Sequence, residues 1–102
     1  MRSIDLDAKG WREPLDFSNA LLHATDAPEG HGNGIAALME GLVWGGTGTI
    51  EPPYAIRISG LNGAPADVVE WVKLIQDRLQ KAKREFKERN GHDVDVTMEI
   101  VS

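Results

Sequence analysis

PEGHGNGIAALMEGL, residues 28–42, joins a loop with three glycines in five residues to a segment of helical periodicity. Because Asn33 is a good N-cap, we expect a helix that begins near it and ends around Trp44. Glycine-rich backbone lets another molecule approach closely, or lets the chain turn where side chains would clash. The stretch therefore predicts a helix that is preceded by a glycine-rich loop, to which another molecule can come close. Its apolar face consists of Ile35, Leu38, Met39 and Leu42.

Three segments around this stretch alternate between apolar and polar residues, as half-buried strands do. They are residues 3–7, 54–59 and 94–101. Residues 15–24 have the apolar face of a short helix, and residues 65–89 have that of a long one, with Asn90-Gly91 as its C-cap. The predicted order is strand, helix, helix, strand, helix, strand.

Helices between successive strands imply parallel neighbours joined by right-handed crossovers. Strands covered on both faces are apolar throughout, whereas these three alternate. We therefore predict an α/β fold in one domain, residues 1–102: a two-layer sandwich with a three-stranded parallel sheet and helices mainly on one face. The spacing in the long helix would also suit a coiled-coil dimer, but packing on the sheet explains the same stripe and is favoured.

The net charge of −5 is unevenly distributed. Residues 1–51 hold eight acidic residues against three basic ones, whereas residues 52–102 hold eight of each. Since phosphate backbones need a basic face, this distribution argues against a nucleic-acid partner. It suits a basic protein partner attracted at long range. A surface charge that only keeps the protein soluble explains it equally well.

The absence of cysteine excludes disulfides, thiolate catalysis and cysteine-ligated metal sites. No apolar run is long enough for a membrane span, and residues 1–5 hold no hydrophobic signal core. We therefore expect a cytoplasmic protein without a membrane partner. The three histidines lack metal-ligand spacing on any one element, so we expect no metal and no cofactor. A monomer is the expected oligomeric state.

Three features of the glycine-rich stretch bear on chemistry: the glycines, His31 and Glu40. Residues 30–34 lack the lysine and Ser/Thr of a phosphate-binding loop, and no strand immediately precedes them. His31 is a candidate general base, but no partner nucleophile is evident and a surface histidine is the simpler explanation. Glu40 lies beside Ala36 and Ala37 on the predicted outer face. It is either a solvated acid or a carboxylate that enters a partner's cationic pocket.

Within residues 28–42, the pattern Pro-Glu-x-x-Gly-x-x-Ile-x-Ala-Leu-x-Glu-x-Leu resembles the signature of the barstar family of ribonuclease inhibitors. That signature reads Pro-Glu-aromatic-aromatic-Gly-x-Asn-Leu-Asp-Ala-Leu-x-Asp-x-Leu. The predicted order of strands and helices is also similar to the family's over the whole chain. The resemblance implies a two-layer sandwich with parallel strands in the order 1-2-3. It also implies that the loop and motif helix plug the active site of a bacterial ribonuclease.

Carried over by position, Glu40 takes the place of the family's principal acid, which replaces substrate phosphate among the nuclease's cationic groups. It is one methylene longer than the usual aspartate. Ala36 stands where the family has a preceding acid. The other departures are Gly30 and His31 at the aromatic pair, and Gly34 at the family's asparagine, with Asn33 adjacent.

We therefore expect a non-catalytic inhibitor or immunity protein that occludes the active site of a basic nuclease, a ribonuclease in the first place. Since aromatic and charged anchors are missing, we do not expect tight inhibition of the family's standard ribonuclease. The main alternative is a barstar-like interaction or regulatory module without a nuclease partner, and a small enzyme using His31 is the third. The expected partner-binding residues are Gly30, His31, Gly32, Asn33, Gly34, Ala36, Ala37 and Glu40.

Overall fold

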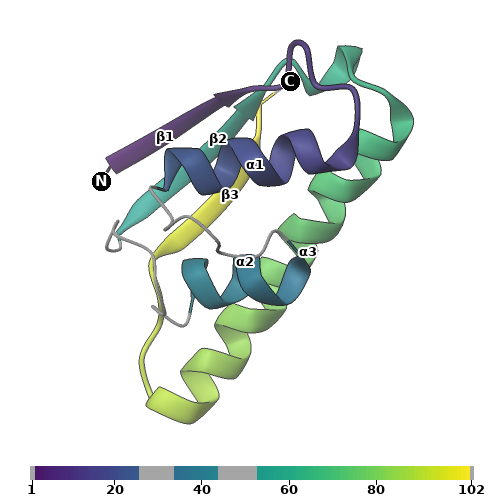
Figure 1. The fold of residues 1–102 in the computed structure, drawn as a ribbon. Coiled ribbons are helices and arrows are strands. Elements are labelled where there is room, and N and C mark those ends of the chain that lie inside the picture. Colours follow the sequence, from purple (N-terminus) through teal and green to yellow (C-terminus); the bar gives the residue numbers. More distant parts are fainter. Residues whose placement is uncertain (1, 26–33, 44–52, 102) are drawn as a thin grey trace.

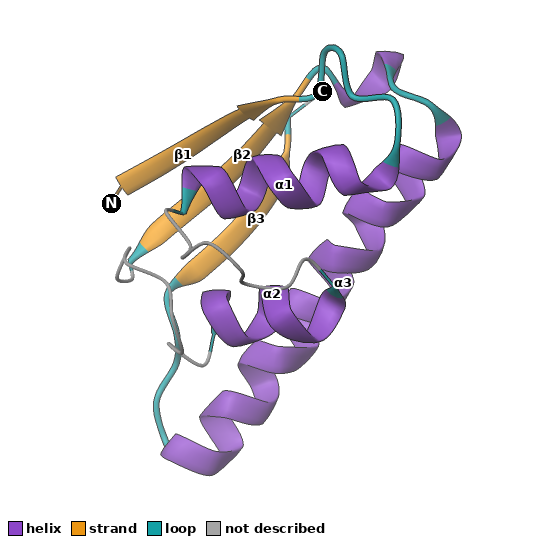
Figure 2. Cartoon of the chain, viewed as in Figure 1, coloured by secondary structure: helices purple, strands orange, loops and turns teal. Residues whose placement is uncertain are grey.

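In the described part of the chain, three α-helices lie on one side of a three-stranded sheet (Figures 1 and 2). The structure, a computed structural model, describes residues 2–25, 34–43 and 53–101. Its elements are β1 (Arg2–Asp7), α1 (Pro14–Ala24), α2 (Ile35–Leu42), β2 (Tyr54–Ser59), the 3-10 helix η1 (Leu61–Gly63), α3 (Ala66–Asn90) and β3 (Val96–Ile100). The predicted α/β sandwich is confirmed.

All strand pairs are parallel, and the order in the sheet is β1-β2-β3. The register places Ile4, Ile56 and Met98 in one row across the sheet. These three side chains are buried, whereas Asp5, Arg57 and Glu99 form the adjacent row of the other face and are exposed. The alternation in the sequence therefore separates a helix-covered face from a polar face that no described helix covers.

The core lies between the sheet and α3. One stripe of the helix is buried, in agreement with its predicted periodicity, and each large aliphatic side chain in it contributes about 1.5–3 kcal/mol by leaving water. Residues from α1, α2 and all three strands belong to the same core cluster. Gly91 ends α3 with a φ of 76°, which confirms the predicted C-cap. The buried stripe consists of Val68, Val72, Ile75, Leu79 and Ala82.

The start of α1 is held by Pro14 in its first turn and by the carboxylate of Asp16. Asp16 Oδ2 accepts hydrogen bonds from the backbone N–H of Arg12 at 2.8 Å and of Glu13 at 3.1 Å. Both bonds favour the charged carboxylate, so they lower the pKa of Asp16 below its ordinary value. This local arrangement fixes the direction in which the chain enters the helical layer.

The last strand is shorter than the predicted segment 94–101. The backbone N–H of Val96 bonds to the carbonyl of Val94 at 3.0 Å, so the chain turns there instead of running extended. The first bond from β2 reaches this segment at the carbonyl of Asp95, from the N–H of Tyr54 at 3.0 Å. Val94 is nevertheless buried. Its apolar side chain therefore extended the alternating pattern of the strand by two residues in the sequence.

Candidate protein-binding site

The candidate site centres on α2, which lies against α3 on the helical side of the molecule (Figure 1). The helix begins one residue later than predicted. The N–H of Leu38 donates to the carbonyl of Gly34 at 3.0 Å, and Gly34 is extended, with φ −80° and ψ 174°. The N-cap is therefore Gly34, and the prediction of Asn33 is wrong. The helix also ends at Leu42, before the predicted Trp44, which lies outside the described residues.

Three apolar side chains hold α2 in place. Leu38, Met39 and Leu42 are buried, as the helical spacing predicted, and Val43 after the helix is buried too. In contrast, Ala36 is exposed and Ala37 is half-buried. Small side chains on the outer part of a helix let another surface come close to its backbone. These two consecutive alanines therefore leave the outer surface of α2 low within its first turn.

Glu40 follows Ala36 by one turn of α2. The conformation of its side chain lies outside the described part of the structure, and so do residues 30–33 of the predicted contact loop, with His31 among them. Of the eight predicted partner-binding residues, the structure thus describes the surroundings of Gly34, Ala36 and Ala37. Gly34 is exposed, and a Cβ added there would meet no atom within 4 Å.

A pocket of about 320 Å³ lies at the other end of α3, between that helix, η1 and the end of β3. It has no lining residue from α2. Within the described ranges, no group of three His, Asp or Glu side chains is placed to hold a metal ion. No described helix is both long enough and apolar enough to cross a membrane. The pocket is lined by Leu61, Asn62, Val69, Lys73 and Ile100.

Sequence reasoning missed one charged feature, the row Asp5–Arg57–Glu99 on the uncovered sheet face. Arg57 Nε lies 3.6 Å from Glu99 Oε2. Each of the three residues stands at an outward position of its own strand, which the alternation does reveal. Their alignment depends on the register between strands, for which the separate segments carry no local signal.

No model of a known protein family matches the sequence, and no curated protein matches it either.

Proposed function

We propose that this chain is a barstar-like inhibitor or immunity protein that occludes the active site of a basic nuclease, a ribonuclease in the first place. The glycine-rich loop and the outer face of α2 form the plug. The carboxylate of Glu40 takes the position of a substrate phosphate among the enzyme's cationic groups. The protein itself supplies no catalytic group.

The observation that carries this proposal is the combination of fold and helix placement. A parallel sheet in the order β1-β2-β3, with its helices on one side, is the arrangement that the family resemblance implies. Within it, α2 is anchored through buried Leu38, Met39 and Leu42, while Ala36 on the same helix is exposed. A helix anchored by three buried side chains, with small side chains on its outer surface, is suited to insertion into a concave site, because a preformed helix does not have to be ordered on binding.

The test begins with tagged protein purified from its native cells, and with the identification of any nuclease that comes with it. Cleavage of fluorogenic RNA and DNA by that nuclease is then measured against increasing inhibitor. We expect wild-type protein to inhibit, and added salt to weaken the inhibition, because opposite charges attract across the interface. The variant Glu40→Ala should weaken inhibition about 30-fold or more, as for a central charged hot spot.

Glu88→Ala is the matched control, since it removes the same side chain from an exposed position near the end of α3. It should inhibit like the wild type. If Glu40→Ala and Glu40→Arg both inhibit as well as the wild type, while circular dichroism shows all variants folded, the plug model is wrong.

One observation favours a second candidate, an interaction or regulatory module of the same fold without a nuclease partner. Ala36 presents an exposed methyl group at the position where the resemblance places an acid. This chain therefore lacks a charge with which a barstar-like plug would bind cationic groups. A complex from native cells that holds no nuclease, but binds through Gly34 and Ala36, would favour this candidate.

A further inference from the structure

The outer edge of β1 carries free backbone hydrogen-bonding groups. Among the strands that the structure describes, β1 pairs with β2 alone. The N–H of Ala8 donates to the carbonyl of Ser59 on β2 at 2.8 Å, so in this parallel ladder the even-numbered residues of β1 bond to β2. The N–H and C=O groups of Ser3, Asp5 and Asp7 therefore face the outer edge. Within the described ranges, no hydrogen bond reaches them.

The side chains of the same residues make this edge acidic. Asp5 and Asp7 are exposed on the uncovered sheet face. Asp5 Oδ1 accepts a hydrogen bond from the hydroxyl of Ser3 at 3.3 Å, and Asp7 Oδ1 accepts one from the backbone N–H of Lys9 at 2.9 Å. Among the described residues, neither carboxylate has a cation within 4.0 Å.

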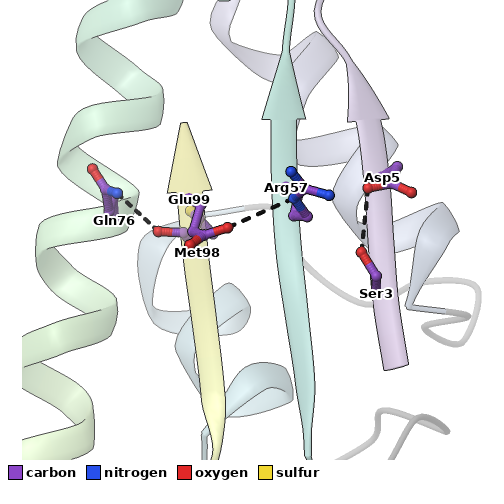
Figure 3. A network of polar contacts seen from close by, with 6 residues as sticks. All are labelled: Ser3, Asp5, Arg57, Gln76, Met98 and Glu99. Atoms are coloured by element: carbon purple, nitrogen blue, oxygen red, sulfur yellow. Dashed lines mark hydrogen bonds and ion pairs between the residues drawn. The ribbon is translucent and has the colours of Figure 1, made fainter. Parts of the chain in front are cut away.

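The row Asp5–Arg57–Glu99 across the sheet indicates which charge on a partner would suit the outer edge of β1. Arg57 stands between Asp5 and Glu99 in the register, but its guanidinium pairs with Glu99 (Figure 3). The signs therefore alternate as negative, positive and negative from β3 to β1, and the next position in the row would be beyond the edge. Because opposite charges directly across a pair of strands stabilise the pairing, a cation is the side chain that suits this position.

We propose that an extended, basic segment of a partner protein pairs with the outer edge of β1 as a fourth strand. Its backbone binds the N–H and C=O groups of Ser3, Asp5 and Asp7. Its lysine or arginine side chains, two residues apart, lie opposite the two aspartates on the uncovered face. Backbone bonds supply affinity in such strand addition, and the alternate side chains supply specificity.

A second copy of this chain does not fit the edge. In parallel self-pairing, the outward odd-numbered residues of one copy align with even-numbered residues of the other, so Asp5 would lie opposite the apolar Ile4 or Leu6. In antiparallel self-pairing with the faces aligned, it would face Ser3, Asp5 or Asp7, so carboxylates would crowd together without a cation. The acidic edge therefore opposes self-association and favours a basic partner. This surface is distinct from α2 and does not depend on the proposed nuclease inhibition.

The test uses the isotope-labelled full chain and a capped hexapeptide that alternates lysine and valine. Amide hydrogen exchange and chemical shifts are recorded by NMR during titration. We expect saturable binding that slows exchange at Ser3, Asp5 and Asp7, whereas Ile4 and Leu6 do not change because their amides already bond to β2. The same peptide with glutamate in place of lysine should not bind, and neither should one N-methylated along its pairing edge.

The double variant Asp5→Asn and Asp7→Asn removes both charges but keeps an acceptor oxygen for Lys9. It should bind the lysine peptide about three- to tenfold more weakly. Glu88→Gln is the control for loss of a distant acid and should bind normally. The proposal is overturned if the lysine peptide does not saturate, if it protects odd and even amides alike, or if the glutamate peptide binds equally well. Glu40→Ala should leave peptide binding unchanged, so this test and that of the plug can fail separately.

Discussion

At the scale of single residues, the buried side chain of Tyr54 makes the stability of the protein depend on pH. Its side chain faces the core from β2, and burial raises its pKa from 10.0 to about 12. The folded protein therefore holds this proton more tightly than the unfolded chain does. The resulting stabilisation is fully present below pH 10 and is lost as the pH rises towards 12, by up to about 3 kcal/mol.

The measurement is urea unfolding at a series of pH values across this range, for wild type and Tyr54→Phe. The variant lacks the only tyrosine of the chain, so the difference between the two pH profiles isolates this group from the lysines. The wild type should lose stability more steeply. Parallel profiles would show that Tyr54 is not held neutral by the fold.

Gly60 and Gly91 share one reason for being glycine, and Gly60 has a second. Both adopt positive φ, 72° and 76°, but a Cβ at Gly60 would also lie 3.0 Å from Asp7 Oδ1 and 3.4 Å from the backbone N of Lys9. We expect Gly91→Ala to cost about 1 kcal/mol and Gly60→Ala about 1–2 kcal/mol more. Gly63→Ala is the control, because a Cβ there meets nothing within 4 Å. Equal midpoints of chemical unfolding for all three variants would contradict this ranking.

At the scale of elements, the surface of α2 can be changed without disturbing its anchors. Ala36 is exposed in the first turn of the helix, where an acid interacts favourably with the helix dipole. Ala36→Asp should therefore leave the stability unchanged or raise it by up to about 1 kcal/mol. Under the proposed function it restores the acid that the family resemblance places there, and it should strengthen nuclease inhibition.

Ala66→Asp is the matched control, since Ala66 is exposed in the first turn of α3. It should likewise leave the thermal stability unchanged or slightly raised, with no change in inhibition. If Ala36→Asp folds normally but leaves inhibition of the identified nuclease the same or weaker, position 36 does not face the enzyme.

At the scale of the whole molecule, α1 and α3 are tied by one hydrogen bond between residues far apart in sequence. Trp71 Nε1 donates to Ser18 Oγ at 2.9 Å, and Ser18 is fully buried. Ser18→Ala leaves the indole N–H without this acceptor and should cost about 1–3 kcal/mol. Since all layers share one core, tryptophan fluorescence and circular dichroism should report the same shifted transition.

Asn19→Ala, at the exposed neighbouring position, is the control and should change stability much less. Separate transitions for the two probes in Ser18→Ala would mean that α1 detaches before the rest of the molecule unfolds. That result would contradict a single cooperative core.

Because the described helices all lie on one side, the other face of the sheet has no described helix over it. Parallel sheets are usually covered on both faces. Here Arg57 and Glu99 form an exposed ion pair in the central row, and Asp5 completes the row at the edge. Charged and small polar side chains make this face compatible with water, while helices cover the opposite face.

Most elements were predictable because their signals are local. The period-two alternation identified residues 54–59 as a strand with both ends correct, and the stripe from Val68 to Ala82 identified α3. The N-cap of α2 and the start of β3 were wrong by one or two residues, since both depend on which backbone groups bond to each other. The 3-10 helix η1 spans only Leu61–Gly63, which is too short for a periodic signal in the sequence.

The candidate site was predictable only in part. Sequence periodicity correctly placed Leu38, Met39 and Leu42 inside and Ala36 outside. The proposed role of Glu40 in binding a nuclease rests on the resemblance to the barstar family, and the inhibition assay of Glu40→Ala tests it. For Asp5 and Asp7, alternation in the sequence indicated only that they point outward. It did not indicate that their strand lies at the edge of the sheet, because that depends on which strands pair with it.

The sequence by itself determined the strands, the helices and the face that each one buries, because hydrophobic spacing acts over a few residues. Only the tertiary structure decided that Arg57 stands between Asp5 and Glu99, and that the odd-numbered backbone groups of β1 face outward. Register and edges arise from pairing between segments some 40 to 50 residues apart, so no single segment encodes them.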